Sequence, residues 1–90
     1  MLRTTAGAGI ELFEVPSPEA GLHHADPPRA MRRSGFGHVG LETDDLDAAY
    51  AAAIDAGAAE VWGPRSSPQA GMRMAFLHDP EGNLIELIGA

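Results

Sequence analysis

Histidines and carboxylates are the side chains of this sequence that could do chemistry, because it holds 4 histidines, 13 Asp and Glu residues and no cysteine. The absence of cysteine excludes disulfides and thiolate chemistry. His38 and Glu86 each lie in a segment of alternating residues, which turns them to the face opposite their apolar neighbours. An imidazole and a carboxylate on one sheet face can transfer protons or bind a divalent ion. The pattern fits equally well two ordinary polar residues on a half-exposed sheet.

Other polar candidates have a simpler structural explanation. His78 precedes a turn, where Asp79 and Asn83 are expected to hydrogen-bond the backbone. His23 and His24 are adjacent in a proline-rich stretch, and neighbours of that kind rarely share one metal ion. Four large apolar side chains either line a hydrophobic substrate pocket or fill core and interface: Trp62, Met72, Met74 and Phe76.

The elements that must position these residues follow the order strand, helix and three strands. The helix is expected from Asp45 to Ala56, with Asp44 as its N-cap and Gly57 as the residue that ends it. Its apolar residues form one stripe: Leu46, Ala49, Tyr50, Ala53 and Ile54. The strands are expected at residues 36–43, 59–62, 72–77 and 84–88. This order predicts an α+β fold with one complete βαβββ module over residues 36–90.

Two further segments precede that module. Residues 8–15 alternate and are expected to form a strand, whereas 16–35 form a connector too rich in proline for a helix or a central strand. Residues 9–12 (GIEL) echo residues 84–87 (LIEL), so residues 1–15 are interpreted as the remnant of a first module. With the spacing of the second module, the first-module counterpart of His38 would precede residue 1. The chain is therefore expected to begin inside that first module.

Composition excludes several classes of function. A hydrophobic share of 44% and a charged share of 21% are those of a globular domain, and 90 residues give one small core. The net charge of −7 argues against a nucleic-acid surface, which needs clustered Lys and Arg. No apolar run approaches the length of a membrane span, and no signal-peptide pattern is present, so a cytoplasmic protein is expected.

Three stretches together carry a family resemblance. They are residues 37–41 (GHVGL), residues 44–47 (DDLD) and the hairpin of residues 76–87 (FLHDPEGNLIEL). They resemble the second module of the vicinal oxygen chelate superfamily, which includes glyoxalases, bleomycin-resistance proteins and extradiol dioxygenases. Residues 9–12 look like the final strand of that family's first module. The resemblance implies paired βαβββ modules that curl into a cup around a divalent metal ion.

The resemblance also implies a ligand set. In its glyoxalase I branch the matching positions are His38, Glu86 and Glu11, while the fourth ligand position has no counterpart in these 90 residues. In its dioxygenase branch only His38 and Glu86 match. Such donors suit Zn, Ni, Fe, Mn or Co ions, which can stabilise an enediolate as Lewis acids. Glu86 is then the candidate catalytic base, because a ligating carboxylate can leave the metal to take a proton from carbon.

Three functional hypotheses follow. The first is a metal-dependent lyase, isomerase or epimerase on a small oxo or hydroxy substrate. The second is a small-molecule-binding protein without chemistry, like the bleomycin-resistance branch, and the third is an inactive fragment. The expected partner is a second copy of the chain, because two copies of residues 36–90 in a homodimer would bring together two His38 and two Glu86 side chains.

Overall fold

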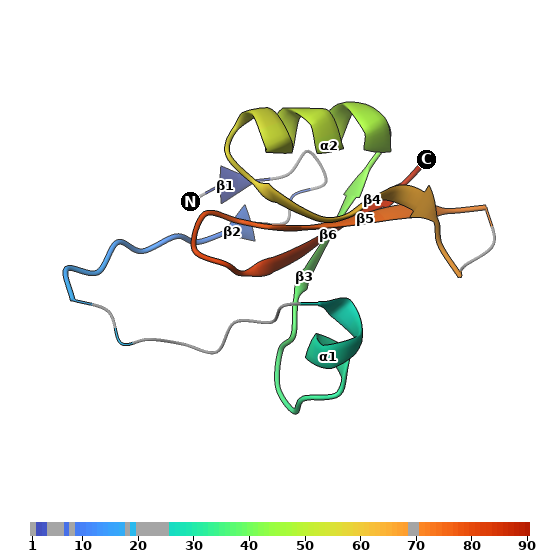
Figure 1. Cartoon of the computed structure of the whole chain (residues 1–90). Coiled ribbons are helices and arrows are strands. Elements are labelled where there is room, and N and C mark those ends of the chain that lie inside the picture. The colour runs from blue at the N-terminus through green and yellow to red at the C-terminus, as the bar shows by residue number, and fades with distance from the viewer. Residues whose placement is uncertain (1, 4–6, 8, 18, 20–25, 69–70) are drawn as a thin grey trace.

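A four-stranded mixed sheet organises the chain (Figure 1). The computed structural model describes residues 2–3, 7, 9–17, 19, 26–68 and 71–90. The strands lie in the order β3-β6-β5-β4, with β3 parallel to β6 and the other pairs antiparallel. Their bounds are β3 Val39–Thr43, β4 Ala59–Ser66, β5 Arg73–His78 and β6 Leu84–Gly89, with helix α2 Leu46–Asp55 between β3 and β4. The predicted βαβββ order and α+β class are confirmed.

The two faces of the sheet are covered by different helices (Figure 1). On one face Leu46 of α2 is fully buried against Ala75, Leu77 and Leu87. On the other face Phe76 and Leu84 pack against Ala30 of the short helix α1, Pro27–Met31. Alternation in β5 and β6 divides the apolar residues between these faces, as a period of two requires. Burial of one large apolar side chain contributes roughly 1.5–3 kcal/mol, so both clusters matter in a domain this small.

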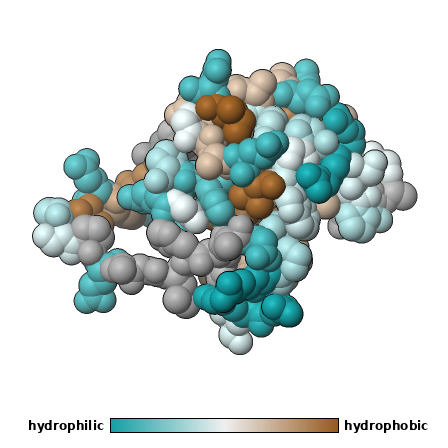
Figure 2. Space-filling view, in the orientation of Figure 1, coloured by the Kyte–Doolittle hydropathy of each residue, from teal (hydrophilic) through white to brown (hydrophobic). Residues whose placement is uncertain are grey.

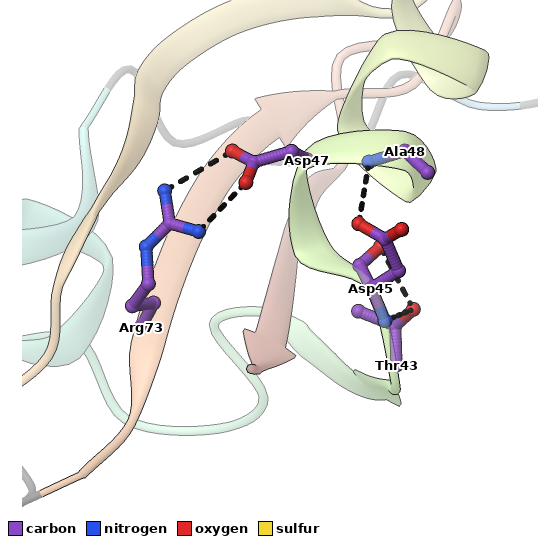
Figure 3. Close-up of polar contacts among 5 residues, drawn as sticks. All are labelled: Thr43, Asp45, Asp47, Ala48 and Arg73. Atoms are coloured by element: carbon purple, nitrogen blue, oxygen red, sulfur yellow. Dashed lines mark hydrogen bonds and ion pairs between the residues drawn. The ribbon is translucent and has the colours of Figure 1, made fainter.

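The N-terminus of α2 is fixed by backbone N–H groups that donate to the side chains of Asp45 and Thr43 (Figure 3). The Asp45 carboxylate accepts from the backbone N–H of Ala48 at 3.1 Å, and Thr43 Oγ1 accepts from the Asp45 N–H at 3.2 Å. The N-cap is therefore Asp45, one residue later than the predicted Asp44. Both residues are aspartates, so the sequence pattern could not tell which one adopts the extended backbone of a cap.

An ion pair joins the first turn of α2 to the sheet (Figure 3). Arg73 at the start of β5 donates to both carboxylate oxygens of Asp47, at 2.8 and 3.1 Å. The hydrogen bonds from Arg73 hold the pKa of Asp47 below its ordinary value. The pair is exposed, so its main effect is to align α2 with β5 rather than to add much stability.

The end of α2 agrees with the prediction, whereas its apolar stripe differs from it. Gly57 has φ +112°, which confirms the predicted left-handed residue after the helix. The apolar stripe is narrower than predicted, because Ile54 is 37% exposed. The rest of the stripe packs against the buried cluster on this face: Leu46, Ala49, Tyr50 and Ala53.

The turn between β5 and β6 is stabilised by Asp79. Its side chain accepts from the backbone N–H groups of Glu81 and Asn83, at 3.0 and 2.8 Å, and from the Asn83 amide at 2.9 Å. Partial burial opposes ionisation of Asp79, but these hydrogen bonds and one from Gly82 outweigh it and lower the pKa of Asp79. The turn role predicted for Asp79 and Asn83 thus has direct geometric support.

Four segments differ from the prediction. The strand expected over residues 36–43 begins at Val39. Residues 16–35 were expected to contain no helix, but α1 forms there, with Asp26 as its N-cap and prolines in its first turn. Of the described residues in the strand expected over 8–15, only Gly9–Ile10 form a strand, β2, which pairs with β1, Leu2–Arg3. β4 continues to Ser66, beyond the predicted end at residue 62, because an edge strand tolerates Pro64 and two bulges.

The described surface is mainly polar on the side drawn in Figure 2, where apolar residues form separate small patches. None of the helices formed by the described residues is long and apolar enough to cross a membrane. The largest exposed apolar side chains of the described part are Leu12, Phe13 and Phe36, at 73%, 81% and 103% exposure. They lie before β3, so the unburied apolar area is concentrated in the segment that leads into the module.

We predict that Asp45→Ala lowers the free energy of unfolding by about 1 kcal/mol, because the Ala48 N–H loses its acceptor. Asp44→Ala is the matched control and should change stability by less than about 0.5 kcal/mol. Urea unfolding followed by circular dichroism measures both. Equal losses in the two variants would contradict the cap assignment.

We predict that Asp79→Asn destabilises the protein by about 1 kcal/mol at pH 7, since the acceptor is charged and only partly buried. A lowered folded-state pKa gives stability that is full above the unfolded value of about 3.9 and is lost as pH falls through the folded value. The gap between wild type and variant should therefore close below about pH 4. Urea titrations at a series of pH values test this, and a constant gap would contradict it.

Candidate functional site

The structure brings His38 and Glu86 together. His38 immediately precedes β3, Glu86 lies within β6, and the parallel register sets Gly40 opposite Glu86. His38 Nε2 is 3.2 Å from Glu86 Oε1, and the two side chains are 23% and 18% exposed. A nitrogen and an oxygen donor from the first and last strands of the module therefore meet in a partly buried place.

Gly40 leaves room for the Glu86 carboxylate. A Cβ atom at position 40 would lie 3.7 Å from Glu86 Oε1, which is an ordinary van der Waals contact. A branched side chain there would extend further toward the carboxylate and press against it. The missing side chain thus lets Glu86 lie along β3 toward His38.

Phe76 supports the pair from β5. Its ring makes an edge contact with the His38 ring, with centroids 5.4 Å apart and planes at 71°. It makes a second edge contact with Trp62 at 5.5 Å and 88°. Phe76 is 1% exposed and lies opposite Glu86 in the β5–β6 register. A rigid buried ring therefore restricts the position of the His38 imidazole.

An apolar cavity of about 520 Å³ opens beside Glu86. We call it the apolar cavity. Three of the four residues predicted as pocket or core line it, namely Trp62, Met74 and Phe76, whereas Met72 is absent from the lining drawn from the described residues. The described residues of its lining are Pro27, Pro28, Met31, Trp62, Ser67, Pro68, Met74, Phe76, Glu86 and Ile88. Its volume falls in the range of small-molecule sites, roughly 300–1,000 Å³.

Sequence reasoning missed the wall that α1 gives to this cavity. Pro27, Pro28 and Met31 line it, although residues 16–35 were interpreted as a connector. The sequence did carry a signal, because Asp26 before two prolines is a helix-start pattern. Gly37 lets α1 approach β3, since a Cβ at that position would lie 2.9 Å from the Ala30 carbonyl oxygen.

A second hollow of about 380 Å³ lies beside His38. We call it the edge hollow. His38 lines it, together with Ile10 and Leu12, which flank Glu11 in the chain. The remaining lining residues are Phe36, Val39, Leu41, Asp79, Asn83, Leu84 and Ile85. Glu86 thus faces the apolar cavity while His38 faces the edge hollow, so the pair lies between the two.

The other candidate ligands do not join this pair in the described structure. Glu11 is exposed, although its neighbours in the chain line the edge hollow. His23 and His24 lie outside the described residues. Within the part of the chain that is described, no three His, Asp or Glu side chains are grouped closely enough to hold a metal ion. The described part of one chain therefore offers two donors at this place.

A second polar contact that sequence reasoning missed lies away from the site. Tyr50 of α2 donates a short hydrogen bond to Glu60 of β4. Burial, followed by the hydrogen bond and charge of Glu60, raises the pKa of Tyr50 to about 12. Tyr50 stays protonated at physiological pH, so this contact ties α2 to β4 and plays no part in proton transfer near Glu86.

Comparison with known proteins places the chain in a family. The family model of the Glyoxalase/Bleomycin resistance protein/Dioxygenase superfamily matches residues 1–87, which is nearly the whole chain. The chain therefore belongs to this superfamily, as the three sequence stretches indicated. No curated protein matches the chain.

We predict that Gly40→Val separates His38 from Glu86, while Gly40→Ala keeps them paired. Only the branched side chain reaches beyond the 3.7 Å contact that a Cβ would make with Glu86 Oε1. Crystal structures of both variants measure the Nε2–Oε1 distance directly. A pair that stays at hydrogen-bond distance in Gly40→Val would contradict the role given to Gly40.

Proposed function

We propose that this protein is a divalent-metal-dependent lyase, isomerase or epimerase that acts on a small oxo or hydroxy substrate. The observation that carries the proposal is the His38–Glu86 pair, 3.2 Å apart and partly buried beside an apolar cavity of about 520 Å³. Membership of the superfamily supports it, since members often use divalent metals and bind small molecules.

The donor set fits a borderline metal ion. Imidazole nitrogen and carboxylate oxygen suit Zn²⁺, Ni²⁺, Fe²⁺, Mn²⁺ or Co²⁺. Two protein donors are fewer than the three that catalytic zinc sites use. The missing donors have two possible sources: Glu11 of the same chain, or the His38 and Glu86 of a second copy. We favour the second copy, because Glu11 is exposed whereas His38 and Glu86 are already side by side.

The edge of the sheet supports association with a second copy. β3 is the terminal strand of the described sheet, so one side of it has no strand beside it. Val39 on this strand is 50% exposed, and Phe36 just before it is fully exposed. Two copies joined through this region would cover both side chains and bring two His38–Glu86 pairs toward each other.

The residues present can carry a proton-transfer reaction. Glu86 faces the apolar cavity, so its carboxylate can take a proton from the carbon of a substrate bound there. Without a metal ion, the hydrogen bond with His38 holds the Glu86 carboxylate in place. A divalent ion bound at His38 and Glu86 would stabilise negative charge that develops on a substrate oxygen.

The second candidate is a binding protein without chemistry, as in the bleomycin-resistance part of the family name. The apolar cavity favours it, because its described lining residues are apolar except for Ser67 and Glu86. In this case Glu86 would serve as a hydrogen-bond acceptor for the ligand. Metal retention and proton exchange distinguish the two candidates.

We predict that the purified protein retains about half a divalent ion per chain after exposure to mixed metal ions and dialysis, as a site shared between two copies requires. His38→Ala should abolish retention, whereas Asp44→Ala, which removes an exposed carboxylate at the other end of β3, should not. Elemental analysis combined with mass measurement in solution gives the ratio and the oligomeric state.

Other ratios have different meanings. About one ion per chain, lost in Glu11→Gln, would replace the shared site with a local one that uses Glu11. No retained metal in the wild type would overturn the metal-dependent proposal and leave the binding protein. A purely monomeric mass would overturn the shared site.

We predict that the metal-loaded protein accelerates exchange of the α-protons of 2-hydroxyacetophenone for deuterium, because Glu86 removes a proton from carbon. Glu86→Gln should slow exchange at least about 100-fold, the usual contribution of a general base. Glu81→Gln, in the exposed turn, is the control. Proton NMR in deuterium oxide follows the reaction, and exchange that is unaffected by Glu86→Gln would contradict the catalytic role.

A further inference from the structure

The apolar cavity carries information about the substrate that the donor pair alone does not. Among the described residues of its lining, Glu86 is the only ionisable one, and none of them is Lys, Arg or His. Ser67 is the only other polar side chain in this described lining. A ligand that fills the cavity would therefore meet mostly hydrocarbon, sulfur and aromatic surface.

The size and the lining of the apolar cavity suit a ring-shaped apolar group. An apolar cavity of about 150 Å³ can hold benzene, and this one measures about 520 Å³. Trp62 and Phe76 stand edge to face in its wall, an arrangement that offers an aromatic guest both a ring face and a ring edge. Met31 and Met74 add flexible, polarisable surface that adapts to the outline of a guest.

The charge of the cavity selects against anions. An anionic group in this cavity would meet the Glu86 carboxylate and no cation among the described lining residues, and unpaired charge at an apolar wall is costly. Arg65 stacks on Trp62, with its guanidinium carbon 5.2 Å from the ring centroid, but it is exposed and does not line the cavity. The net charge of −7 adds to the unfavourable potential for an anion.

We propose that the apolar cavity receives the body of the substrate, which is a neutral oxo or hydroxy compound bearing a ring-sized apolar group. The oxygen-bearing end lies toward Glu86 and His38. This placement of the oxygens rests on the proposed function, whereas the choice of a neutral apolar body rests on the cavity alone. Small polar substrates and carboxylate-bearing substrates are excluded as preferred ligands.

The single tryptophan makes the cavity directly observable. Trp62 is the only Trp in the chain and lines the cavity, so its indole N–H resonance reports occupancy. Three probes are titrated into ¹⁵N-labelled full-length protein in EDTA. Hydroxyacetone and 2-hydroxyacetophenone share two neighbouring oxygens and differ in the ring, while phenylglyoxylate keeps the ring and adds a negative charge.

We expect 2-hydroxyacetophenone to shift the Trp62 resonance and to bind at least about tenfold more tightly than hydroxyacetone, because only its ring buries apolar area. Phenylglyoxylate should bind about tenfold or more weakly than 2-hydroxyacetophenone. Equal affinities of the two neutral probes would overturn the apolar-body assignment. Equal or tighter binding of phenylglyoxylate would overturn the selection against anions.

A matched pair of variants locates the binding. Ile88→Phe adds a ring inside the cavity and should weaken 2-hydroxyacetophenone at least about fivefold, whereas Ile54→Phe on the opposite face of the sheet should leave it unchanged. Equal effects would overturn the location. If Ile88→Phe does not fold, the wild-type probe series still decides the proposal.

Metal retention, measured separately, distinguishes failure of the metal-dependent function from failure of the assigned substrate class. A wild type that retains metal through His38 but binds both neutral probes equally would sink this substrate class and leave the proposed function standing. A wild type that retains no metal but prefers 2-hydroxyacetophenone would overturn the metal-dependent function and leave the assigned substrate class standing.

Discussion

The parallel pairing of β3 with β6 is the constraint on which the rest of the structure depends. It joins the first and last strands of the module, with Gly40 opposite Glu86 and Thr43 opposite Gly89. Gly89 permits the close approach, because a side chain there would collide with the backbone of Thr43. The same pairing brings the chain end to α2, where the Leu46 N–H donates to the Ala90 carbonyl at 3.0 Å. Without this register His38 and Glu86 would not meet.

The two faces of the sheet have different roles. The α2 face is closed, with Leu46 and Ala75 fully buried, and it supplies the main apolar cluster of the module. The opposite face carries Phe76, Glu86 and the short helix α1, which only partly covers it and leaves the apolar cavity. Stability and ligand binding are therefore assigned to different side chains of the same strands, through the alternation of β5 and β6.

Local signals predicted most of the module. Alternation located β5 and β6 to within one residue, and the Asp79 turn and Gly57 are short-range features with a clear chemical cause. Helix α1 was missed because it has only five residues, and packing of Ala30 against the sheet contributes more to it than helix propensity. The cap moved by one residue because neighbouring aspartates cannot be ranked by pattern alone.

Less of the candidate site than of the fold could be predicted from the sequence. Alternation could assign His38 and Glu86 to one kind of face, but their approach to 3.2 Å depends on strand order, which no local pattern contains. The lining of the cavity depends on α1 and on Pro68, residues far apart in the chain from Glu86. Glu11 illustrates the same limit, since its assignment came from a short echo and its side chain is exposed.

The most direct test of the central claim is anomalous diffraction from crystals soaked in Zn²⁺. We expect a peak within about 2.0–2.2 Å of both His38 Nε2 and Glu86 Oε1, with the two side chains parted to hold the ion. A peak elsewhere, or no peak while His38 and Glu86 remain hydrogen-bonded to each other, would contradict it.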